Sequence, residues 1–570
     1  MQPRHVNGPE RPPGAPARGL APARRAILWA ALVALAALAC GHWLRMGTPV
    51  ELAEPGAERL ECVSYAPFRR PGETPFDPEA FVDEARIEAD LRLLAPLTGC
   101  VRTYAVANGL DAVPRVAARL GMTVLLGAWL GRDREENEAE LRAVVELARE
   151  HRGTVRAVVV GNEVMLRREL PEAELVEYLE RVRREVPVPV TYADVWEFWI
   201  KHPSIAPAVS FVTIHILPYW EDEPVGIDAA IAHVVDVHRL MHERLPGREI
   251  LVGETGWPSE GRTRHDAAAG RVEQARFARQ FSRAAAEHGI RYNFIEAFDQ
   301  PWKRHLEGAM GGAWGLLDSD GRPKFDWHGP VAPRERWAHG LWAAAAGALA
   351  LGAALAAAGR RHGAAAHAAV GVPVGAALGA TLAEQARYMV VWNRTWLEWL
   401  ATGVWTALAA AACAAAALWL ARRLGGRDAA VPVLPPMGSV LRQWLREDRH
   451  PRLEGWVSLL QGLVLFGAAL TVVLHGFDAR YRGFPWPLFA PPAAAAALVW
   501  LAGARRAAGA VEERWLAGVA AAGAAVMVVA EGPANGEALG YASIVLVLAG
   551  AAWARASTSS PSSAPTPAGS

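Results

Sequence analysis

Eight apolar stretches constrain what this chain can fold into more than any other feature of its sequence. A helix that crosses the hydrocarbon core of a bilayer needs about 20 mostly apolar residues. Stretches of this kind are Ile27–Leu44, Trp337–Ala358, Ala364–Ala383, Trp399–Leu420, Trp456–Leu474, Leu488–Gly503, Trp515–Ala530 and Ala538–Ala554. They predict a transmembrane anchor within 24–44 and a helical bundle of about seven spans over 337–555.

The region between the first two apolar stretches has a different character. Residues 59–328 contain 34 Lys and Arg against 43 Asp and Glu, whereas the rest of the chain contains 25 against 16. The whole chain is neutral, so it lacks the concentrated positive charge that binding to nucleic acid requires. The distribution predicts an acidic, water-soluble domain inserted into a basic, apolar membrane protein, with the lipid bilayer as a partner and no nucleic acid.

Basic residues between the apolar stretches predict the orientation. Arginines gather at 24–25, 360–361, 422–452 and 505–506, while the loops at 384–398 and 531–537 are balanced or acidic. With eight spans, every basic cluster falls on one side, which the positive-inside rule assigns to the cytoplasm. We therefore expect a multi-pass plasma-membrane protein. Both termini would be cytoplasmic, and residues 45–336 would lie in the periplasm or outside the cell.

The N-terminal segment allows two other interpretations. Arg24-Arg25 before an apolar run is also typical of a cleavable signal peptide, and Ala37-Leu38-Ala39-Cys40 is a poor lipoprotein motif. No clean small-residue cleavage site follows, so an uncleaved anchor with a structural Cys40 is favoured. The ends of the chain, 1–23 and 556–570, are of low complexity and are expected to be disordered.

The soluble region alternates short apolar runs with amphipathic ones. Predicted strands are Glu61–Ala66, Cys100–Val106, Thr123–Ala128, Arg156–Gly161, Val188–Ala193, Val209–His215, Glu249–Glu254 and Tyr292–Phe298. Predicted helices include Pro78–Leu94, Glu135–Glu150, Glu172–Glu185, Ile227–Leu245 and Ala267–Glu287. Eight strand–helix units predict a (β/α)8 TIM barrel over 59–328. A doubly wound sheet is the alternative, but no Gly-rich phosphate loop follows the first strand.

Four cysteines in 570 residues exclude a disulfide scaffold, and no Cys/His cluster has zinc spacing. Cys62 and Cys100 fall on neighbouring predicted strands. Outside the cytoplasm they could form a disulfide, but a bridge between adjacent parallel strands would be strained. Two buried thiols are therefore the favoured interpretation, and we expect no metal and no cofactor.

Polar and aromatic side chains follow the predicted strand ends, where active sites lie in TIM barrels. They are Tyr65, Tyr104, Trp129, Asn162 with Glu163, Tyr192 with Asp194, His215 with Tyr219, Glu254 with Trp257, and Glu296 with Asp299. Apolar packing explains the strands themselves but not acids at so many strand ends.

Glu163 and Glu254 form the sharpest pair. Glu163 ends the fourth predicted strand and Glu254 the seventh, and these strands face each other across a barrel mouth. Cleavage of a glycosidic bond with retention requires two carboxyl groups about 5 Å apart, one as acid and one as nucleophile. Either residue alone could instead stabilise a helix N-terminus. Two such residues, each closely following Val-Gly, favour catalysis.

The motifs Val160-Gly161-Asn162-Glu163, Val252–Ser259 (VGETGWPS) and Val101-Arg102-Thr103-Tyr104 resemble glycoside hydrolase family 17, the β-1,3-glucanases. The resemblance covers about 60–328 and implies a retaining (β/α)8 enzyme. By the same resemblance, Glu163 is the acid/base, Glu254 is the nucleophile, and Asn162 binds the sugar 2-hydroxyl.

The segment Phe294–Lys303 departs from the pattern of the plant enzymes. It resembles a bacterial membrane-bound branch linked with β-glucan synthesis and remodelling. Transfer of glucan to another sugar is therefore an alternative to hydrolysis, and a preference for β-1,3 or β-1,6 linkages stays open.

Further residues are candidates for binding substrate. Aromatic rings could stack on sugars, with Trp129, Trp220 and Trp302 as candidates besides those given below. His215 and Asp194 could bind hydroxyls or hold the acids, and Lys303 could balance Glu296. Together with Asn162, the predicted substrate-binding set is Tyr65, Tyr104, Tyr192, His215, Tyr219, Trp257, Glu296 and Lys303. For each aromatic residue, ordinary packing is the alternative.

Three functions compete. The first is a membrane-anchored, retaining enzyme that hydrolyses or transfers β-glucan. The second is a non-catalytic, glucan-binding ectodomain, which intact Glu163 and Glu254 argue against. The third is part of a polysaccharide synthesis or export apparatus, with such machinery as a partner. The predicted spans contain few charges, and His367 is the clearest ionisable residue within them.

Overall fold

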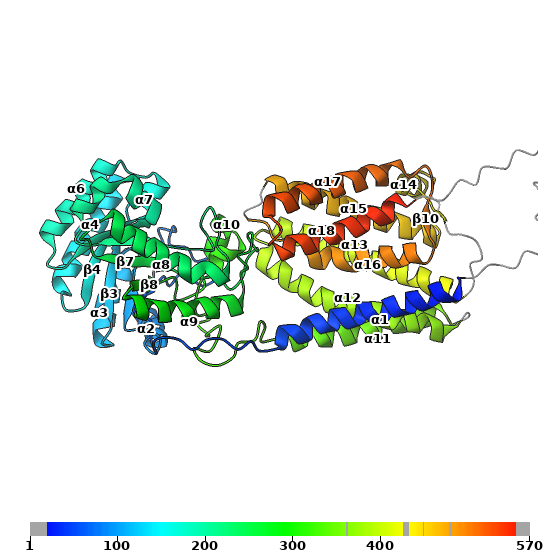
Figure 1. Cartoon of the computed structure of the whole chain (residues 1–570), viewed down its shortest axis with the longest axis horizontal. Coiled ribbons are helices and arrows are strands. Elements are labelled where there is room, and N and C mark those ends of the chain that lie inside the picture. Colours follow the sequence, from blue (N-terminus) through cyan, green and yellow to red (C-terminus); the bar gives the residue numbers. More distant parts are fainter. Residues whose placement is uncertain (1–19, 361–362, 426–432, 448–449, 478–480, 555–570) are drawn as a thin grey trace, which may run out of the picture.

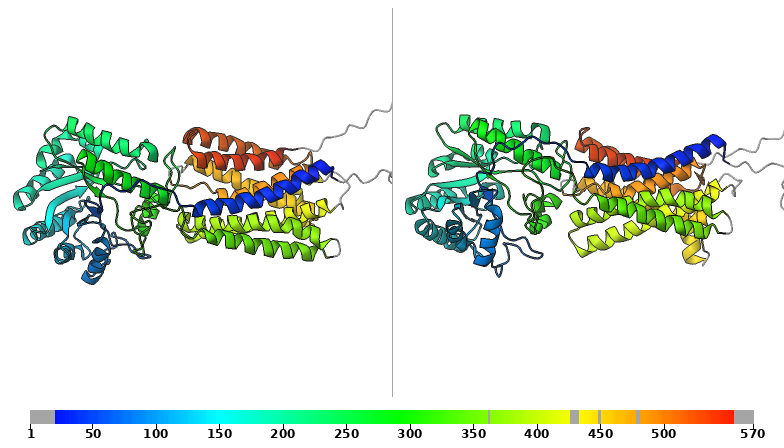
Figure 2. Two further views of the ribbon diagram at one scale, coloured as in Figure 1. Left: turned by 60° about the horizontal axis from the view of Figure 1, so that its bottom comes forward. Right: turned by 90° about the horizontal axis from the view of Figure 1, so that it is seen from below.

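The computed structural model describes residues 20–360, 363–425, 433–447, 450–477 and 481–554. It consists of a barrel and a helical bundle arranged end to end, as Figures 1 and 2 show. Most of the predicted tails, and Arg361, Arg427 and Arg449 of the basic clusters, lie outside the described residues.

The barrel is closed and entirely parallel, with its strands in chain order from β1 to β8. The strands are β1 (Val63–Ser64), β2 (Cys100–Arg102), β3 (Thr123–Ala128), β4 (Val155–Asn162), β5 (Val190–Val195), β6 (Val212–His215), β7 (Ile250–Thr255) and β8 (Arg291–Phe294). Pairing of β1 with β8 closes the circle through Val63 and Phe294. The prediction of a TIM barrel is therefore confirmed, with β1, β2 and β8 shorter than the apolar runs suggested.

Helices surround these strands. They are α2 (Glu84–Leu94), α3 (Val113–Arg119), α4 (Arg134–Glu150), α5 (Val164–Arg167), α6 (Glu172–Glu185), α7 (Trp196–Lys201), α8 (Ile227–Arg244), α9 (Arg271–His288) and α10 (Arg304–Glu307). The Asp133 side chain caps the N-terminus of α4, because it accepts hydrogen bonds from the backbone N–H groups of Glu135 and Glu136. The apolar faces of these helices pack on β-branched strand residues such as Val158 and Val160 to form the core.

Cys62 and Cys100 form a disulfide, so the prediction of two thiols was wrong. Val63 of β1 pairs with Val101 of β2, which places the two preceding cysteines side by side. Their Cα atoms are 4.5 Å apart, within the range that a disulfide spans. The prediction assumed strain without knowing this register.

The remaining long helices form the bundle. They are α1 (Pro22–Gly47), α11 (Ala338–Ala358), α12 (Ala364–Trp392), α13 (Trp396–Leu424), α15 (Leu453–Phe477), α16 (Trp486–Leu501), α17 (Val511–Glu531) and α18 (Gly536–Trp553). Seven of them are long and apolar enough to cross a membrane, and α16 is a shorter apolar helix. These helices suggest a membrane protein and confirm the predicted anchor and bundle.

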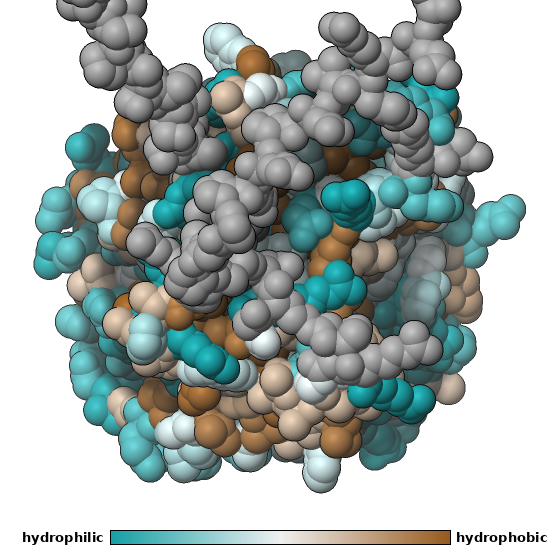
Figure 3. Space-filling view, turned by 90° about the vertical axis from the view of Figure 1, so that its right-hand side faces the viewer, coloured by the Kyte–Doolittle hydropathy of each residue, from teal (hydrophilic) through white to brown (hydrophobic). Residues whose placement is uncertain are grey.

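Two features of the bundle differ from the sequence-based expectation. The predicted loop at 384–398 is a tight turn at 393–395, because α12 continues to Trp392 and a capping box of Thr395 and Glu398 starts α13 at once. The amphipathic helix α14 (Met437–Arg446) was not predicted; it lies near the short pair β9 (Val433–Leu434) and β10 (Arg505–Arg506). Figure 3 views the bundle end away from the barrel, where hydrophilic and hydrophobic side chains mix over the helix ends.

The barrel presents the carboxyl ends of its strands to the bundle. Loops that follow β6, β7 and β8 contact the bundle through Trp220, Arg262 and Arg304. Short α10, on the loop after β8, lies on the side of the barrel that faces the bundle (Figure 1). The strand ends, where active sites lie in TIM barrels, therefore face the bundle.

Candidate active site

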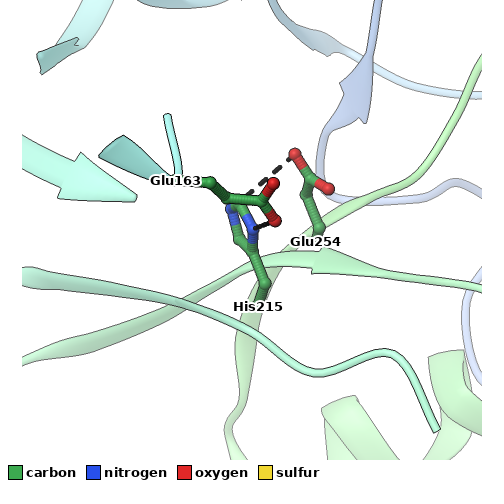
Figure 4. Close-up of side chains that lie close together, drawn as sticks. All are labelled: Glu163, His215 and Glu254. Carbon is green, nitrogen blue, oxygen red and sulfur yellow. Dashed lines mark hydrogen bonds and ion pairs between the residues drawn. The ribbon is translucent and has the colours of Figure 1, made fainter. Parts of the chain in front are cut away.

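Glu163 and Glu254 converge at the carboxyl end of the barrel (Figure 4). Glu163 directly follows β4, and Glu254 is the penultimate residue of β7. One carboxylate oxygen of each lies within 4.8 Å of the other and of a His215 ring nitrogen. The folding of the barrel thus brings together the two acids that the sequence singled out.

The backbone of Glu163 is in the left-handed region, with φ of 53°. A non-glycine residue pays about 1–3 kcal/mol for a strained backbone, which persists where the surroundings enforce it and is common at functional sites. Glu163 N–H donates to the Ala193 carbonyl of β5 at 2.7 Å, and the Glu163 carbonyl accepts from Arg167. The turn into α5 therefore holds this carboxylate at the strand end.

His215, the last residue of β6, lies between the two acids. Its Nδ1 is 2.9 Å from Glu163 Oε1, and its Nε2 is 3.7 Å from Glu254 Oε1. The first distance is a hydrogen bond and the second is an electrostatic contact. The ring is completely buried, so the imidazole fixes the separation of the carboxylates.

Burial by itself would raise the pKa of Glu163, but its neighbours outweigh that effect. The hydrogen bond and the charge of His215, with the charges of Arg167 and Arg102, hold the pKa of Glu163 below its ordinary value. The ionised carboxylate is the form that can accept a proton. To act as an acid, Glu163 must itself carry a proton.

Arg102, at the end of β2, contacts this site, although sequence reasoning gave it no role. Its Nη1 donates to Glu254 Oε1 at 3.1 Å and to the Gly253 carbonyl at 2.9 Å, and its Nη2 donates to Asn162 Oδ1. The residue is 1% exposed. The sequence does carry one signal for this contact: Arg102 is a charged residue at the end of an apolar strand. A charge that is buried there needs a partner.

Asn162 is the last residue of β4 and is buried beside the acids. Its Oδ1 accepts a hydrogen bond from Arg102, so its Nδ2 group points away from that guanidinium. The chain of contacts from Asn162 through Arg102 to Glu254 links β4, β2 and β7 across the barrel.

Tyr192 and Asp194 of β5 form hydrogen bonds to the backbone of α5, the short helix that follows Glu163. Tyr192 donates its hydroxyl to Asp194 Oδ2, and the Met165 N–H of α5 reaches the Tyr192 hydroxyl at 2.9 Å. Burial raises the pKa of Asp194 to about 6, the Tyr192 hydrogen bond lowers it, and the nearby charge of Glu163 raises it again. These contacts make Asp194 a support for α5.

A second buried carboxylate group follows β8. Lys303 Nζ lies 3.1 and 3.2 Å from the two oxygens of Glu296. Burial raises the pKa of Glu296 to about 7, although the Lys303 charge opposes it. Glu307 of α10 was not predicted; burial raises its pKa, Lys303 opposes this, and the charges of Glu163 and Glu254 add to it.

The predicted aromatic residues divide into two groups. Tyr65, Tyr192, Tyr219 and Trp257 are at most 1% exposed, and their polar atoms bond to Asp90, Asp194, the Arg262 carbonyl and the Ala268 carbonyl. Tyr104, Trp129, Trp220 and Trp302 are partly exposed. The second group offers some exposed ring surface, and a sugar-binding role stays a prediction for both groups.

Glu163, His215 and Glu254 could each offer one ligand atom to a metal ion. Arg102 places a permanent positive charge against Glu254, which opposes a cation at the same oxygen. The arrangement fits two carboxylates that share cationic partners better than it fits a metal centre.

Comparison with known proteins identifies the barrel. A family model for the BtgE/BtgC glycoside hydrolase domain matches residues 62–315. The glucan 1,3-β-glucosidase of Schizosaccharomyces pombe is 30% identical over 236 residues, which are 38% of this chain and 72% of that protein. The chain belongs to the β-1,3-glucanase family.

Other β-1,3-glucanase relatives match the same part of the chain. The glucan 1,3-β-glucosidase of Arthroderma benhamiae is 27% identical over 262 residues, or 43% of this chain and 84% of the relative. Among solved structures, a family 17 β-1,3-glucanosyltransferase from Rhizomucor miehei has a TM-score of 0.41 and 23% identity, and covers 46% of this chain and 95% of its own. The family model ends at residue 315, so the C-terminal bundle of this β-1,3-glucanase family member lies outside it.

Proposed function

We propose that this protein is a membrane-anchored, retaining enzyme that cleaves or transfers β-1,3-glucan in β-glucan synthesis or remodelling. The observation that carries the proposal is the approach of Glu163 and Glu254, with oxygens of both acids and a His215 nitrogen all within 4.8 Å. Retaining glycosidases hold their two carboxyl groups about 5 Å apart, whereas inverting enzymes need room for a water between them. The family supports a glucan as substrate.

In the first step, Glu254 is the nucleophile. Its carboxylate attacks the anomeric carbon of the bound sugar, and the bond from that carbon to the leaving oxygen breaks. Glu163 donates a proton to the leaving oxygen, so the released chain carries a hydroxyl group and a glycosyl ester remains on Glu254. Arg102 orients Glu254 through its hydrogen bond to Oε1.

In the second step, Glu163 acts as a base. It accepts the proton of a water or of a sugar hydroxyl, whose oxygen attacks the anomeric carbon and releases Glu254 as a carboxylate. The lowered pKa of Glu163 suits this role. Water as acceptor gives hydrolysis, and a second glucan gives transglycosylation.

The same proposal includes an orientation. The Cys62–Cys100 disulfide supports a barrel outside the cytoplasm, because disulfides persist in oxidising compartments. The arginine clusters of the connecting segments support the same side. The catalytic barrel would then face the periplasm or cell exterior of a bacterial plasma membrane, with both termini in the cytoplasm.

The test uses the full-length protein in detergent or nanodiscs with laminari-oligosaccharides and separates the products by length. Shorter products alone indicate hydrolysis, and products longer than the substrate indicate transfer. Binding without any product would overturn the proposal in favour of a glucan-binding ectodomain.

A further inference from the structure

Three loops of the barrel serve both the acid pair and the contact with the bundle. The loop after β6 follows His215 and reaches Trp220, the loop after β7 follows Glu254 and reaches Arg262, and the loop after β8 carries Lys303 and Arg304. The catalytic mouth therefore adjoins the bundle end that faces the barrel. We call the residues of this contact the seam: Trp220, Glu260, Arg262, Thr263, Arg304 and Gly308 of the barrel, and Arg387, Tyr481, Glu531, Asn535 and Glu537 of the bundle.

Charged contacts hold the seam in one arrangement. Arg262 forms an ion pair with Glu531, and each is under 9% exposed. Arg262 Nη1 also donates to the Arg482 carbonyl at 3.1 Å, and Thr263 N–H donates to Glu537 at 3.1 Å. A buried pair of charges tolerates little displacement, because each charge depends on its partner after leaving water. The barrel is thus fixed on the bundle at its catalytic end.

Short α10 belongs to both the site and the seam. Lys303, just before it, contacts Glu296 inside the barrel, while the next residue, Arg304, donates to the carbonyls of Val390 and Val391. Those carbonyls belong to the last turn of α12, where helices have unpaired acceptors and favour a cation. The end of a membrane helix therefore positions a segment next to the acids.

An aromatic pair crosses the seam. The rings of Trp220, from the barrel, and Tyr481, from the bundle, have centroids 6.3 Å apart. Both side chains are partly exposed. The Tyr481 ring also lies against Gly308 at the end of α10, where a Cβ atom would meet the ring at 3.2 Å. Accessible aromatic faces with adjoining polar groups are typical of ligand sites, and the C–H faces of glucose rings pack well on such surfaces.

We infer that Trp220 and Tyr481 form a glucan subsite built jointly by the barrel and the bundle, so that a chain bound across the acids continues over the outer end of the membrane domain. The inference rests on the proposed function and extends it to a substrate class. The preferred substrate is a β-glucan chain lying along the membrane surface, long enough to reach from Glu254 to Tyr481.

The test compares laminari-oligosaccharides of increasing length on the full-length protein in nanodiscs. Tyr481→Ala and Trp220→Ala should each raise the KM of a long oligosaccharide about tenfold more than the KM of the trisaccharide, since one aromatic contact is lost only for the long chain. Tyr481→Phe should behave like the wild type, because the ring face makes the contact. Trp396→Ala is the matched control, since this tryptophan starts α13 and is 72% exposed.

Binding to a Glu254→Gln background, measured by calorimetry, repeats the comparison without turnover. In that background, Tyr481→Leu, which keeps apolar bulk at the seam, should weaken the binding of the long oligosaccharide and leave the binding of the trisaccharide unchanged. If Tyr481→Ala and Trp220→Ala match Trp396→Ala at every length in an active enzyme, the shared subsite is wrong. If the wild type processes no glucan of any length, the proposed function fails instead.

Discussion

Arg102 and Glu254 lie 152 residues apart in the chain, and their side chains meet through a 3.1 Å hydrogen bond inside the barrel. The same guanidinium contacts Asn162 and the Gly253 carbonyl. A planar fork of donors therefore orients the proposed nucleophile and a predicted sugar-binding amide at the same time.

Arg102→Lys should lower kcat/KM about 10- to 100-fold, because lysine keeps the charge but loses the fork that orients Glu254 and Asn162 together. Arg102→Gln should lower it further. Steady-state kinetics with a laminari-oligosaccharide measures both. Equal activity of the lysine variant and the wild type would show that only charge matters at this position.

Glu163→Gln and Glu254→Gln should each reduce turnover by at least roughly 10²–10⁴-fold, the usual contribution of a positioned acid or base. Their thermal midpoints should stay close to that of the wild type, since both side chains keep their shape. Glu180→Gln, on the exposed face of α6, is the matched control. Unfolding of either variant would assign that glutamate a structural role.

Rescue by azide should separate the two acids. In Glu254→Gly, azide enters the vacated space and attacks from the nucleophile's side, which gives the inverted α-glycosyl azide. In Glu163→Ala, a substrate with a good leaving group still forms the glycosyl-enzyme, and azide then gives the β-product. Proton NMR of the products reads the anomeric configuration. Exchanged outcomes would mean that the roles are reversed, and inversion by the wild type would exclude double displacement.

His215→Ala should move the alkaline limb of the kcat/KM profile to higher pH. His215 lowers the pKa of Glu163 by its hydrogen bond and its charge. Without it the carboxyl keeps its proton to a higher pH, so the acid form needed in the first step persists. His215→Gln, which retains a donor but no charge, should shift the limb less. A limb that stays in place or moves to lower pH would contradict the coupling of His215 to the acid.

A reporter that is active only outside the cytoplasm tests the orientation. Fused after Trp327 it should be active, and fused after Arg361 it should be inactive, because one predicted span separates the two positions. Expression of both fusions is checked by immunoblot. Activity at both positions, or at neither, would contradict the proposed orientation of eight spans.

Hydrophobic periodicity in the sequence predicted the barrel, and the polar residues at the predicted strand ends indicated the candidate site. Continuous β-branched runs such as Val158–Val160 marked buried parallel strands, and the closed barrel followed. Glu163 and Glu254 were found because each comes at the end of such a run, Glu254 directly after Val-Gly and Glu163 after Val-Gly-Asn. Their approach in space comes from the circular strand order, which eight repeated units already imply.

Other features depend on register and on long-range packing, which local patterns do not contain. The pairing of Val63 with Val101 decides the Cys62–Cys100 bridge. The role of Arg102 depends on two partners from distant strands. The predicted loop at 384–398 looked like a connection because it carries charges, but Glu384 and Arg387 lie within α12 and pair with each other. Arg387 also pairs with the barrel residue Glu260.

Helices α12 and α13 are 29 residues long each. At 1.5 Å per residue each extends about 44 Å, whereas the hydrocarbon core of a bilayer is about 30 Å thick. Each helix therefore exceeds the core by about 14 Å, or two to three helical turns. The carbonyls that accept hydrogen bonds from Arg304 belong to the C-terminal end of α12. In the proposed membrane orientation, the C-terminal end of α12 that holds Arg304 lies beyond the lipid. The carboxylate pair would then stand in water, where a sugar chain reaches it without entering the bilayer.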